Sequence, residues 1–505
     1  MNTANTPGAA AVAAGGDAFT HDLVIVGAGP AGMSAAMTAM EHGLRTVVLD
    51  EQPRAGGQIY RNVSVAPPTV AALLGSDYRH GGKLVQRFLA SGVETHHDTL
   101  VWDIGRDLTV TAQKAGRSFI VRAPQLLVAN GAMERPSPIL GWTLPGVMNA
   151  GAAQIALKTA GQVPTGAVVL VGNGPLLLLV ACQLLKAGAR VAAIVDTSPA
   201  SNRARARPHA LSALRAPGML AKGLRMLWQL RQAGVPYFKH AESVHFEASD
   251  DQQRVETVSF TSQGSRHRLR ADVVLLHHGL VPNTQIARLL QVNHVWSDTQ
   301  LAWQPVVDHW GQASLAGLRL AGDGCSIGGA LAAQARGAIA ALGAAVALGK
   351  LGAAQAESRA RALRRRLDAQ TAIRPFLDAL YRPPEWLIDC PDETLVCRCE
   401  EVTAGRIREM ARLGCQGPNQ TKFFSRCGMG PCQGRMCGTT VTQVLAQALD
   451  RAPGDVGAYR IRAPLKPVRL DSLAALAEPT STYPSTSTRV ARDDLPLHLR
   501  RAAQP

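Results

Sequence analysis

The sequence predicts an α/β fold with two Rossmann-like dinucleotide-binding domains, followed by a small helical domain. Two short apolar segments, 23–26 and 168–171, each run into a glycine-rich loop and then into a helix-like segment, as in a βαβ unit. Seven of the nine cysteines lie between Cys390 and Cys437, far from both loops. The length of 505 residues leaves room for about three domains of ordinary size.

The composition favours a folded protein from a reducing compartment. Apolar residues make up 46% of the chain and charged residues 18%, which excludes a disordered chain. A secreted disulfide scaffold would not leave the first 389 residues with only two cysteines, so the clustered thiols suggest a metal site. The net charge of +16 allows a basic face for an acidic partner or a membrane surface. No nucleic-acid partner is expected, because aromatic residues make up only 4% and no binding motif is present.

Location is predicted from what the sequence lacks. No apolar run reaches the roughly 18 residues that a membrane helix needs, since 168–185 is interrupted at Gly172–Pro175. The Ala-, Gly- and Thr-rich segment 1–22 has neither the basic nor the apolar region of a signal peptide. We therefore expect a cytoplasmic protein, with peripheral attachment at the inner face of the membrane as the second option.

The first glycine-rich loop predicts nucleotide binding. Gly27 allows the tight turn after the strand, Gly29 lets the backbone approach a pyrophosphate, and Gly32 lets the following helix pack closely. The segment from Met33 to His42 has helical composition, and the amino end of this helix faces the phosphates. Asp50, at the end of the second strand 46–49, is placed to accept a hydrogen bond from the adenosine ribose and to repel a 2′-phosphate.

Three later segments favour FAD as this nucleotide. They are the glycine pair in 56–59, the strand and turn 126–132, and the segment 320–324, a further strand that ends in Gly322-Asp323-Gly324. In this order they resemble the two-dinucleotide-domain flavoproteins of the thioredoxin-reductase-like group. The resemblance implies that Asp323 holds the ribityl chain of the flavin. The predicted cofactor-binding residues are Gly27, Gly29, Pro30, Ala31, Gly32, Asp50, Glu51, Gly57, Gln58, Gly131, Asp323 and Gly329. Gly29 and Asp50 alone do not separate FAD from another adenine nucleotide such as ATP.

The second glycine-rich loop, 172–177, is degenerate. Leu177 takes the place of the third glycine, so we expect its helix to stand off from the strand and distort the phosphate site. We predict a domain that does not use NAD(P)H, and leave open a structural remnant or a site for a different nucleotide. Neither nucleotide-binding domain contains a CxxC or CxxxxC pair, which excludes the redox disulfide of thioredoxin-type reductases.

The cysteine-rich segment predicts a [2Fe–2S] cluster. Cys397 and Cys399 form a Cys-x-Cys pair, and 32 residues separate this pair from Cys432, which with Cys437 forms a CxxxxC pair. Four thiolates in two close pairs suit a [2Fe–2S] cluster, and zinc is the alternative. The predicted metal ligands are Cys397, Cys399, Cys432 and Cys437. Cys427 offers the same spacing to Cys432 and is the alternative fourth ligand, whereas Cys390 and Cys415 are not expected to bind metal.

This segment resembles the bacterioferritin-associated-ferredoxin-like domain, whose distal pair is usually CxxC. Flavoprotein domains followed by such a domain resemble the A (α) subunits of opine oxidases and the B subunit of hydrogen cyanide synthase. The most specific stretches are 56–61, 141–147 and 427–437. The resemblance implies an electron-relay subunit of an amino-acid or opine dehydrogenase (oxidase) that acts on a C–N bond. It also implies a flavoprotein β subunit of the glycine-oxidase or D-amino-acid-dehydrogenase type and a respiratory acceptor. Further expectations are FMN at the interface with the partner and a small ferredoxin-like subunit.

No acid–base pair for a substrate is evident in the sequence, so catalytic residues stay unassigned. Two rival functions remain open. One is a self-contained NAD(P)H-dependent flavin or ferredoxin-type reductase, and the other is a scaffold subunit that holds a non-redox nucleotide. The predicted organisation is a disordered N-terminus (1–20), a discontinuous FAD domain (21–150 and 270–350), a degenerate NAD(P)-like domain (151–269), a helical linker (351–390), the [2Fe–2S] domain (391–450), and an arm with a disordered tail (451–505).

Overall fold

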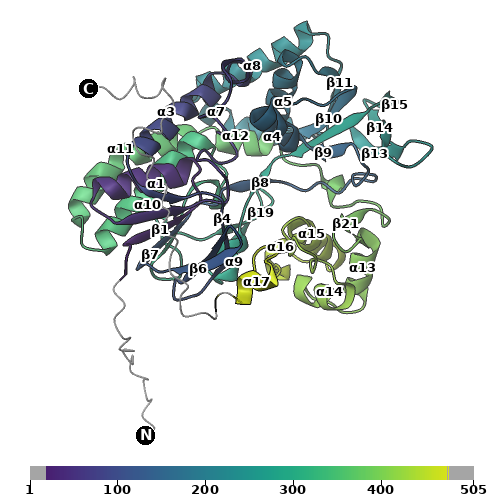
Figure 1. Cartoon of the computed structure of the whole chain (residues 1–505). Coiled ribbons are helices and arrows are strands. Elements are labelled where there is room, and N and C mark those ends of the chain that lie inside the picture. Colours follow the sequence, from purple (N-terminus) through teal and green to yellow (C-terminus); the bar gives the residue numbers. More distant parts are fainter. Residues whose placement is uncertain (1–18, 475, 477–505) are drawn as a thin grey trace.

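The computed structural model describes residues 19–474 and 476 (Figure 1). Most of the predicted disordered N-terminus and of the predicted tail lies outside these residues. Within them the chain builds two parallel sheets covered by helices and a small helical domain beside them.

The first sheet has the strand order β20-β7-β1-β2-β3, and all its neighbours are parallel. These strands are Leu318–Leu320, Gln125–Val128, Leu23–Val26, Thr46–Leu49 and Glu94–His96. The central strands are buried on both faces, which explains their unbroken apolar sequences. Helices α1 (Pro30–Glu41), α3 (Ser76–Ala90) and α10 (Ala330–Ala347) pack on this sheet, and α11 (Ala353–Thr371) packs on α10. The sheet brings the loops after β1, β2, β7 and β20 to one edge.

The second sheet has the order β12-β11-β10-β16-β9 and is also parallel. Its strands are Tyr237–Phe238, Arg190–Asp196, Ala167–Asn173, Val273–His278 and Val147–Asn149, and its helices are α4 (Ala150–Ala160), α5 (Pro175–Lys186) and α8 (Pro217–Gln232). The antiparallel pair β8 (Ala132–Glu134) and β17 (Leu280–Pro282) joins the two domains. The remaining elements of both domains and of the linker are α2 (Pro68–Leu74), β4 (Thr99–Ile104), β5 (Val110–Lys114), β6 (Arg117–Val121), α6 (Asn202–Ala206), α7 (Ala210–Leu214), β13 (Glu242–Ala248), β14 (Val255–Ser262), β15 (Ser265–Arg270), α9 (Gln285–Leu289), β18 (His294–Ser297), β19 (Ala302–Pro305) and α12 (Arg374–Leu380).

Helix α10 corrects one expectation from the sequence. It is long and apolar enough to cross a membrane by length and composition, although 67% of its apolar window is buried inside the fold. Its alanines and glycines allow close helix packing instead, since a Cβ on Gly337 would lie 2.0 Å from the carbonyl oxygen of Ala31. A core helix of a globular domain passes the same test, so this helix is weak support for a membrane span.

The small domain begins with the hairpin β21 (Leu395–Cys397) and β22 (Val402–Thr403). Its helices are α13 (Ala404–Arg412), α14 (Pro418–Ser425), α15 (Gly438–Ala448) and α16 (Pro453–Val456). Thr403 caps the amino end of α13, because its hydroxyl accepts a hydrogen bond from the Arg406 N–H at 3.3 Å.

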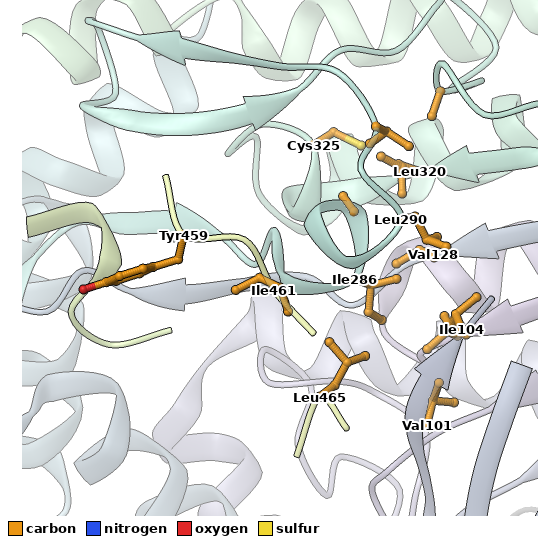
Figure 2. Packing of buried hydrophobic residues seen from close by; sticks show 14 of the residues in the cluster. Val101, Ile104, Val128, Ile286, Leu290, Leu320, Cys325, Tyr459, Ile461 and Leu465 are labelled. Atoms are coloured by element: carbon orange, nitrogen blue, oxygen red, sulfur yellow. The ribbon is translucent and has the colours of Figure 1, made fainter. Parts of the chain in front are cut away.

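An arm, 457–474, returns from the small domain to the first domain and ends in α17 (Leu470–Ala474). Tyr459, Ile461 and Leu465 of this arm belong to one buried apolar cluster with Val101, Ile104 and Val128 of the first domain, as Figure 2 shows. The N–H of Leu465 also donates to the Trp102 carbonyl at 2.7 Å. The small domain and the first domain therefore share a core.

Candidate nucleotide site and cysteine cluster

The first glycine-rich loop has the geometry that its sequence demands. Gly27 has φ +106°, and a Cβ there would lie 2.6 Å from the carbonyl oxygen of Ala129. A Cβ on Gly32 would lie 1.8 Å from the Gly27 oxygen, so the turn and the start of α1 exclude any side chain. Gly29 differs, because the nearest atom to its Cβ would be the Gly57 Cα at 3.9 Å. The fold itself tolerates a methyl group at Gly29, and the open space there suits a pyrophosphate that approaches the backbone.

The second glycine pair packs against this loop. The Gly56 N–H donates to the Ala28 carbonyl at 2.9 Å, and Gly57, at φ +61°, would place a Cβ 2.9 Å from the Gly29 Cα. The same Cβ would lie 3.7 Å from the ring of Pro30. Gly57 thus shapes one wall of the phosphate cradle through its lack of a side chain.

Asp50 and Glu51 have protein partners in this structure. One Asp50 carboxylate oxygen accepts from the Ala28 N–H and the other from the Gln52 N–H at 2.7 Å. Burial raises the pKa of Asp50 above its ordinary value, and these N–H donors act in the opposite direction. Glu51 forms an ion pair with Lys466, which links the end of β2 to the arm.

The loop after β20 completes the sheet edge. One carboxylate oxygen of Asp323 accepts from the N–H groups of Gly328 at 2.9 Å and Gly329 at 3.0 Å, which fixes the start of α10. Ala31 lies under this loop, where a Cβ on Gly322 would be 2.9 Å from its methyl group. Gly131, at φ +67°, leaves open space beside Gly324. Asp323 and Gly131 thus lie at the same edge as Gly29, where a flavin dinucleotide would extend across the sheet.

A buried lysine near this site was not predicted from the sequence. The Lys158 ammonium donates to the Gln58 carbonyl at 3.1 Å and to the Gln154 side-chain oxygen at 2.9 Å. Burial, with a smaller contribution from nearby Arg61, lowers the pKa of Lys158 to about 7. Gln58 is held on its other side, since its side-chain oxygen accepts from Arg61 at 3.1 Å. The only hint in the sequence is a lysine within the apolar helix 150–160.

Side chains of the second domain occupy the space beside the second glycine-rich loop. Leu177 is buried in the core of its domain, where the third glycine would leave space. The His277 ring lies against Gly174, where a Cβ would be 3.8 Å from it, and its Nδ1 lies 2.7 Å from a carboxylate oxygen of Glu134. Asp196, the acidic residue after β11, accepts from the Tyr237 hydroxyl at 2.8 Å.

Residues 380–382 of the linker lie across the same loop. The Asn173 amide donates to the Tyr381 carbonyl at 3.2 Å, and the Asn202 amide donates to the carbonyls of Leu380 at 3.2 Å and Arg382 at 2.9 Å. Ligands of such sheets bind outside the carboxyl ends of the strands. The end of α12 and residues 380–382 occupy part of that position, which a nicotinamide dinucleotide would need.

Three thiols meet in the small domain. The Sγ atoms of Cys397, Cys427 and Cys437 all lie within 4.8 Å of one another, and the three side chains are buried. Hydrogen bonds from Cys427 and Cys437 lower the pKa of Cys397, and the Gly428 N–H donates to its sulfur at 3.4 Å. These hydrogen bonds raise the pKa values of Cys427 and Cys437.

Of the four predicted ligands, the structure brings Cys397 and Cys437 together and adds Cys427. Cys399 is exposed and Cys432 half-buried, and the raised pKa of Cys399 follows from partial burial and from the neighbouring Cys432. A Cβ on Gly430 would lie 2.3 Å from the Cys399 Cβ, so this loop passes close to the first pair. Cys390 and Cys415 are buried outside the three-thiol group. The donor set fits a thiolate-bound metal centre, and the ligand set stays a prediction.

Tyr459 of the arm lies beside the three-thiol group. A Cβ on Gly428 or Gly434 would lie 2.7 Å or 2.5 Å from its ring. The buried hydroxyl of Tyr459 faces Cys427, and its pKa is raised by burial and by the neighbouring thiols. The glycines between the cysteines therefore make room for this ring, a role that spacing alone does not reveal.

Comparisons with known proteins agree with both parts of the site. The model of the pyridine nucleotide-disulphide oxidoreductase family matches residues 21–341, and that of the sarcosine oxidase A3 domain matches residues 392–477. The opine oxidase A subunit of Rhizobium meliloti (strain 1021) is 44% identical over 91% of this chain and 99% of its own length. The HcnB subunit of hydrogen cyanide synthase from Pseudomonas aeruginosa is 35% identical over 88% of this chain and 96% of its own length.

A solved structure supports the fold alone. The crystal structure of L-proline dehydrogenase from P. horikoshii is similar with a TM-score of 0.65 and 18% identity, over 91% of this chain and 79% of that chain. Together with the oxidoreductase family match, it confirms the predicted Rossmann-type α/β fold with a small C-terminal domain.

Proposed function

The chain belongs to the family that includes HcnB of hydrogen cyanide synthase and the opine oxidase A subunit, and we propose from this premise that it is an electron-relay subunit. It is a flavoprotein of the FAD type and a subunit of a multi-subunit oxidase that acts on CH–NH donors. The finer proposal is that electrons from an amino acid or an opine pass through its flavin and a [2Fe–2S] cluster to a respiratory acceptor.

The observation that carries the proposal is the three-thiol group in a domain whose core continues into the flavin domain. Bound FAD and a bound [2Fe–2S] cluster would supply conversion between two-electron and one-electron transfer. Gly29 and Gly57 leave space for the dinucleotide phosphates, and Asp323 lies where the ribityl chain would pass. Cys397 and Cys437 would bind the cluster with two of Cys399, Cys427 and Cys432. Buried Tyr459 excludes water on one side of it.

The relay role requires a second polypeptide that holds the substrate. We propose a flavoprotein β subunit of the glycine-oxidase or D-amino-acid-dehydrogenase type, and further components in the form of FMN at the interface and a small ferredoxin-like subunit. Kinship with one subunit of a multi-subunit oxidase implies such partners in general, and their kinds are our proposal. Its support within this chain is that Asp50 and Asp323, the carboxylates at the first sheet edge, are held by backbone N–H groups and not poised for proton transfer.

The test is spectroscopic and uses the full chain co-expressed with its partner subunits. We expect flavin absorbance, about two irons per chain, and a rhombic one-electron EPR signal after reduction with dithionite. Gly29→Ala should lose the flavin and keep the fold, because a methyl group fits the protein but not beside a pyrophosphate. Stoichiometric zinc without an EPR signal would refute the relay proposal.

Cysteine variants then decide the ligand set. Cys437→Ser should lose the EPR signal, whereas Cys415→Ser, a buried thiol of the same domain outside the group, should keep it. If Cys432→Ser loses the EPR signal and Cys427→Ser keeps it, the ligands predicted from the sequence are supported. The reverse result assigns the fourth position to Cys427, as the three-thiol geometry suggests.

A further inference from the structure

A cavity of about 500 Å³ lies between α12 of the linker and the loop that follows β20. Its walls come from α12 and Arg382, from the turn between β18 and β19, from Ser326 and Ile327 of the loop, and from α10. This volume is in the range of cavities that bind small organic molecules. An inorganic ion, which is about the size of one or two water molecules, would fill only a small part of it.

Basic side chains dominate the lining of this cavity. They come from three parts of the chain and are Arg205, His209, Arg336, Arg374 and Arg382. The acidic residues of the lining are Asp298 and Asp378. Arg135 adds further positive charge beside the cavity, because its buried guanidinium donates to the carbonyl of Gln300, another lining residue. Positive charge therefore exceeds negative charge in a concave site, which attracts anions.

Two of these arginines have no carboxylate partner. Arg336 donates to the Ser326 carbonyl, and Arg382 donates to the Asp298 carbonyl. Neither arginine forms an ion pair with a carboxylate of the described residues. Burial lowers the pKa of Arg382, and the neighbouring Arg205 acts in the same direction, whereas two nearby carboxylates oppose them. The chain itself thus neutralises the charge of these arginines only in part.

A third arginine has a carboxylate partner and still has an unused donor. Arg374 pairs with Asp378, which also accepts a hydrogen bond from the Gln300 amide at 3.3 Å. The Nε atoms of Arg374 and Arg382 are buried and have no hydrogen-bond partner within the part of the chain that the structure describes. A buried donor without a partner costs free energy, so these atoms favour a ligand with acceptor oxygens.

We propose that this cavity binds a small organic dicarboxylate. Arginine suits carboxylates, because its planar guanidinium presents its N–H donors in a fork that matches the two oxygens. Arg336 belongs to α10 and Arg382 follows α12, so a molecule with a carboxylate at each end can meet both walls. The volume favours an organic molecule over an inorganic anion. The proposal depends neither on the flavin nor on the cysteine cluster.

Such a ligand would connect the linker to the loop at the first sheet edge. Arg336 also donates to the Gly322 carbonyl at 3.5 Å, so it holds the loop on both sides of Asp323. A dicarboxylate on Arg336 and Arg382 would bridge α10 and the end of α12. Hydrogen exchange in α12 and in the loop 322–329 should therefore slow when the ligand binds.

The test is isothermal titration calorimetry of the purified full chain with glutarate, a flexible dicarboxylate. Glutaramide, its uncharged analogue, and inorganic phosphate are titrated in parallel. We expect glutarate to bind at a single site per chain and more weakly at high salt. Glutaramide and phosphate should each bind at least about tenfold more weakly than glutarate, because neither can place a charged group on both walls.

Variants of two lining arginines locate the site. Arg336→Gln and Arg382→Gln should each weaken glutarate binding at least about tenfold, because each removes a charge-assisted hydrogen bond. Arg225→Gln is the matched control, since it removes the same charge from an exposed position of α8 outside the cavity. It should bind glutarate like the unaltered chain. Circular dichroism and flavin content show whether the variants remain folded.

Each contrary outcome overturns the proposal. It fails if glutarate does not bind, or if folded Arg336→Gln and Arg382→Gln bind glutarate as tightly as the unaltered chain. Equal or tighter binding of phosphate would assign the cavity to a ligand with a phosphate group. Equal binding of glutaramide would show that the arginines do not recognise charge. If the complex assembled with its partner subunits does not bind glutarate, carboxylates of a partner occupy the cavity instead.

Discussion

Lys158 shows how one residue links the two nucleotide-binding folds. It extends from α4 of the second domain to the Gln58 carbonyl of the first, and its side chain is buried at this junction. The lowered pKa, about 7 against an ordinary value of 10.5, means that the folded chain releases this proton more readily than the unfolded chain. Between pH 7 and pH 10.5, the two pKa values, the unfolded state holds more protons than the folded state. The free energy of unfolding should therefore rise with pH across this window.

The corresponding prediction compares Lys158→Met with the unaltered chain. Between pH 8 and pH 9 the free energy of unfolding of the unaltered chain should rise by about 1.4 kcal/mol relative to the variant, because only the lysine titrates differently. Urea unfolding at both pH values measures the difference, and other titrating groups cancel in the comparison. Parallel changes in the two proteins would show that Lys158 is not neutralised by folding.

The sequence could predict residues that are needed for the local conformation of the backbone. It could not predict residues whose role depends on a contact with a distant part of the chain. Gly27 and Gly32 were recognisable because a strand, a turn and a helix need them at fixed spacing, and the clashes of a Cβ show why. Cys427 was only an alternative ligand, since spacing does not reveal that it lies with Cys397 and Cys437. Lys158 was missed because its burial depends on a loop 100 residues earlier in the chain.

At the scale of elements, the linker changes what the second domain can do. The strand–loop–helix pattern of 168–196 predicted the fold of this domain correctly, as β10, α5 and β11 show. No pattern in 374–382 indicated where α12 would dock, because its hold on the domain uses the backbone carbonyls of residues 380–382. Carbonyl groups are common to every sequence, so such docking cannot be predicted from residue types.

The prediction at this scale concerns pyridine nucleotides. NADH and NADPH should reduce the flavin of the assembled enzyme far more slowly than the amine substrate does. Residues 380–382 lie across the second glycine-rich loop, and the buried side chain of Leu177 takes the place of its third glycine. Stopped-flow absorbance follows the bleaching of the flavin, and dithionite serves as the control that the flavin can be reduced. Bleaching by NADH at the rate of turnover would instead favour a self-contained reductase.

At the scale of the whole molecule, the arm links the flavin domain to the small domain. Its apolar residues join the core of the first domain, and Lys466 reaches Glu51 beside the first glycine-rich loop. The Arg435 side chain of the small domain also donates to the Leu465 carbonyl at 3.1 Å. This arrangement fixes the three-thiol group relative to the first glycine-rich loop.

Two leucines of the arm test this arrangement. Leu465→Ala removes a buried side chain and should lower the free energy of unfolding by about 2–5 kcal/mol. Leu470→Ala is the matched control, because Leu470 is 82% exposed and should change stability by no more than about 0.5 kcal/mol. Hydrogen exchange should quicken in both β4 and β21 for the first variant. If hydrogen exchange quickens only in the arm, the two domains are stable independently.

The covered second loop also bears on how a cell would use this protein. If NADH and NADPH do not reduce the flavin, the protein would neither draw reducing power from the pool of soluble hydride carriers nor return it there. Oxidation of the nitrogen compound would then proceed at a pace set by the compound and by the terminal oxidant, whatever the balance of reduced and oxidised pyridine nucleotides. A cell could then consume such a compound during starvation or during plenty without disturbing that balance.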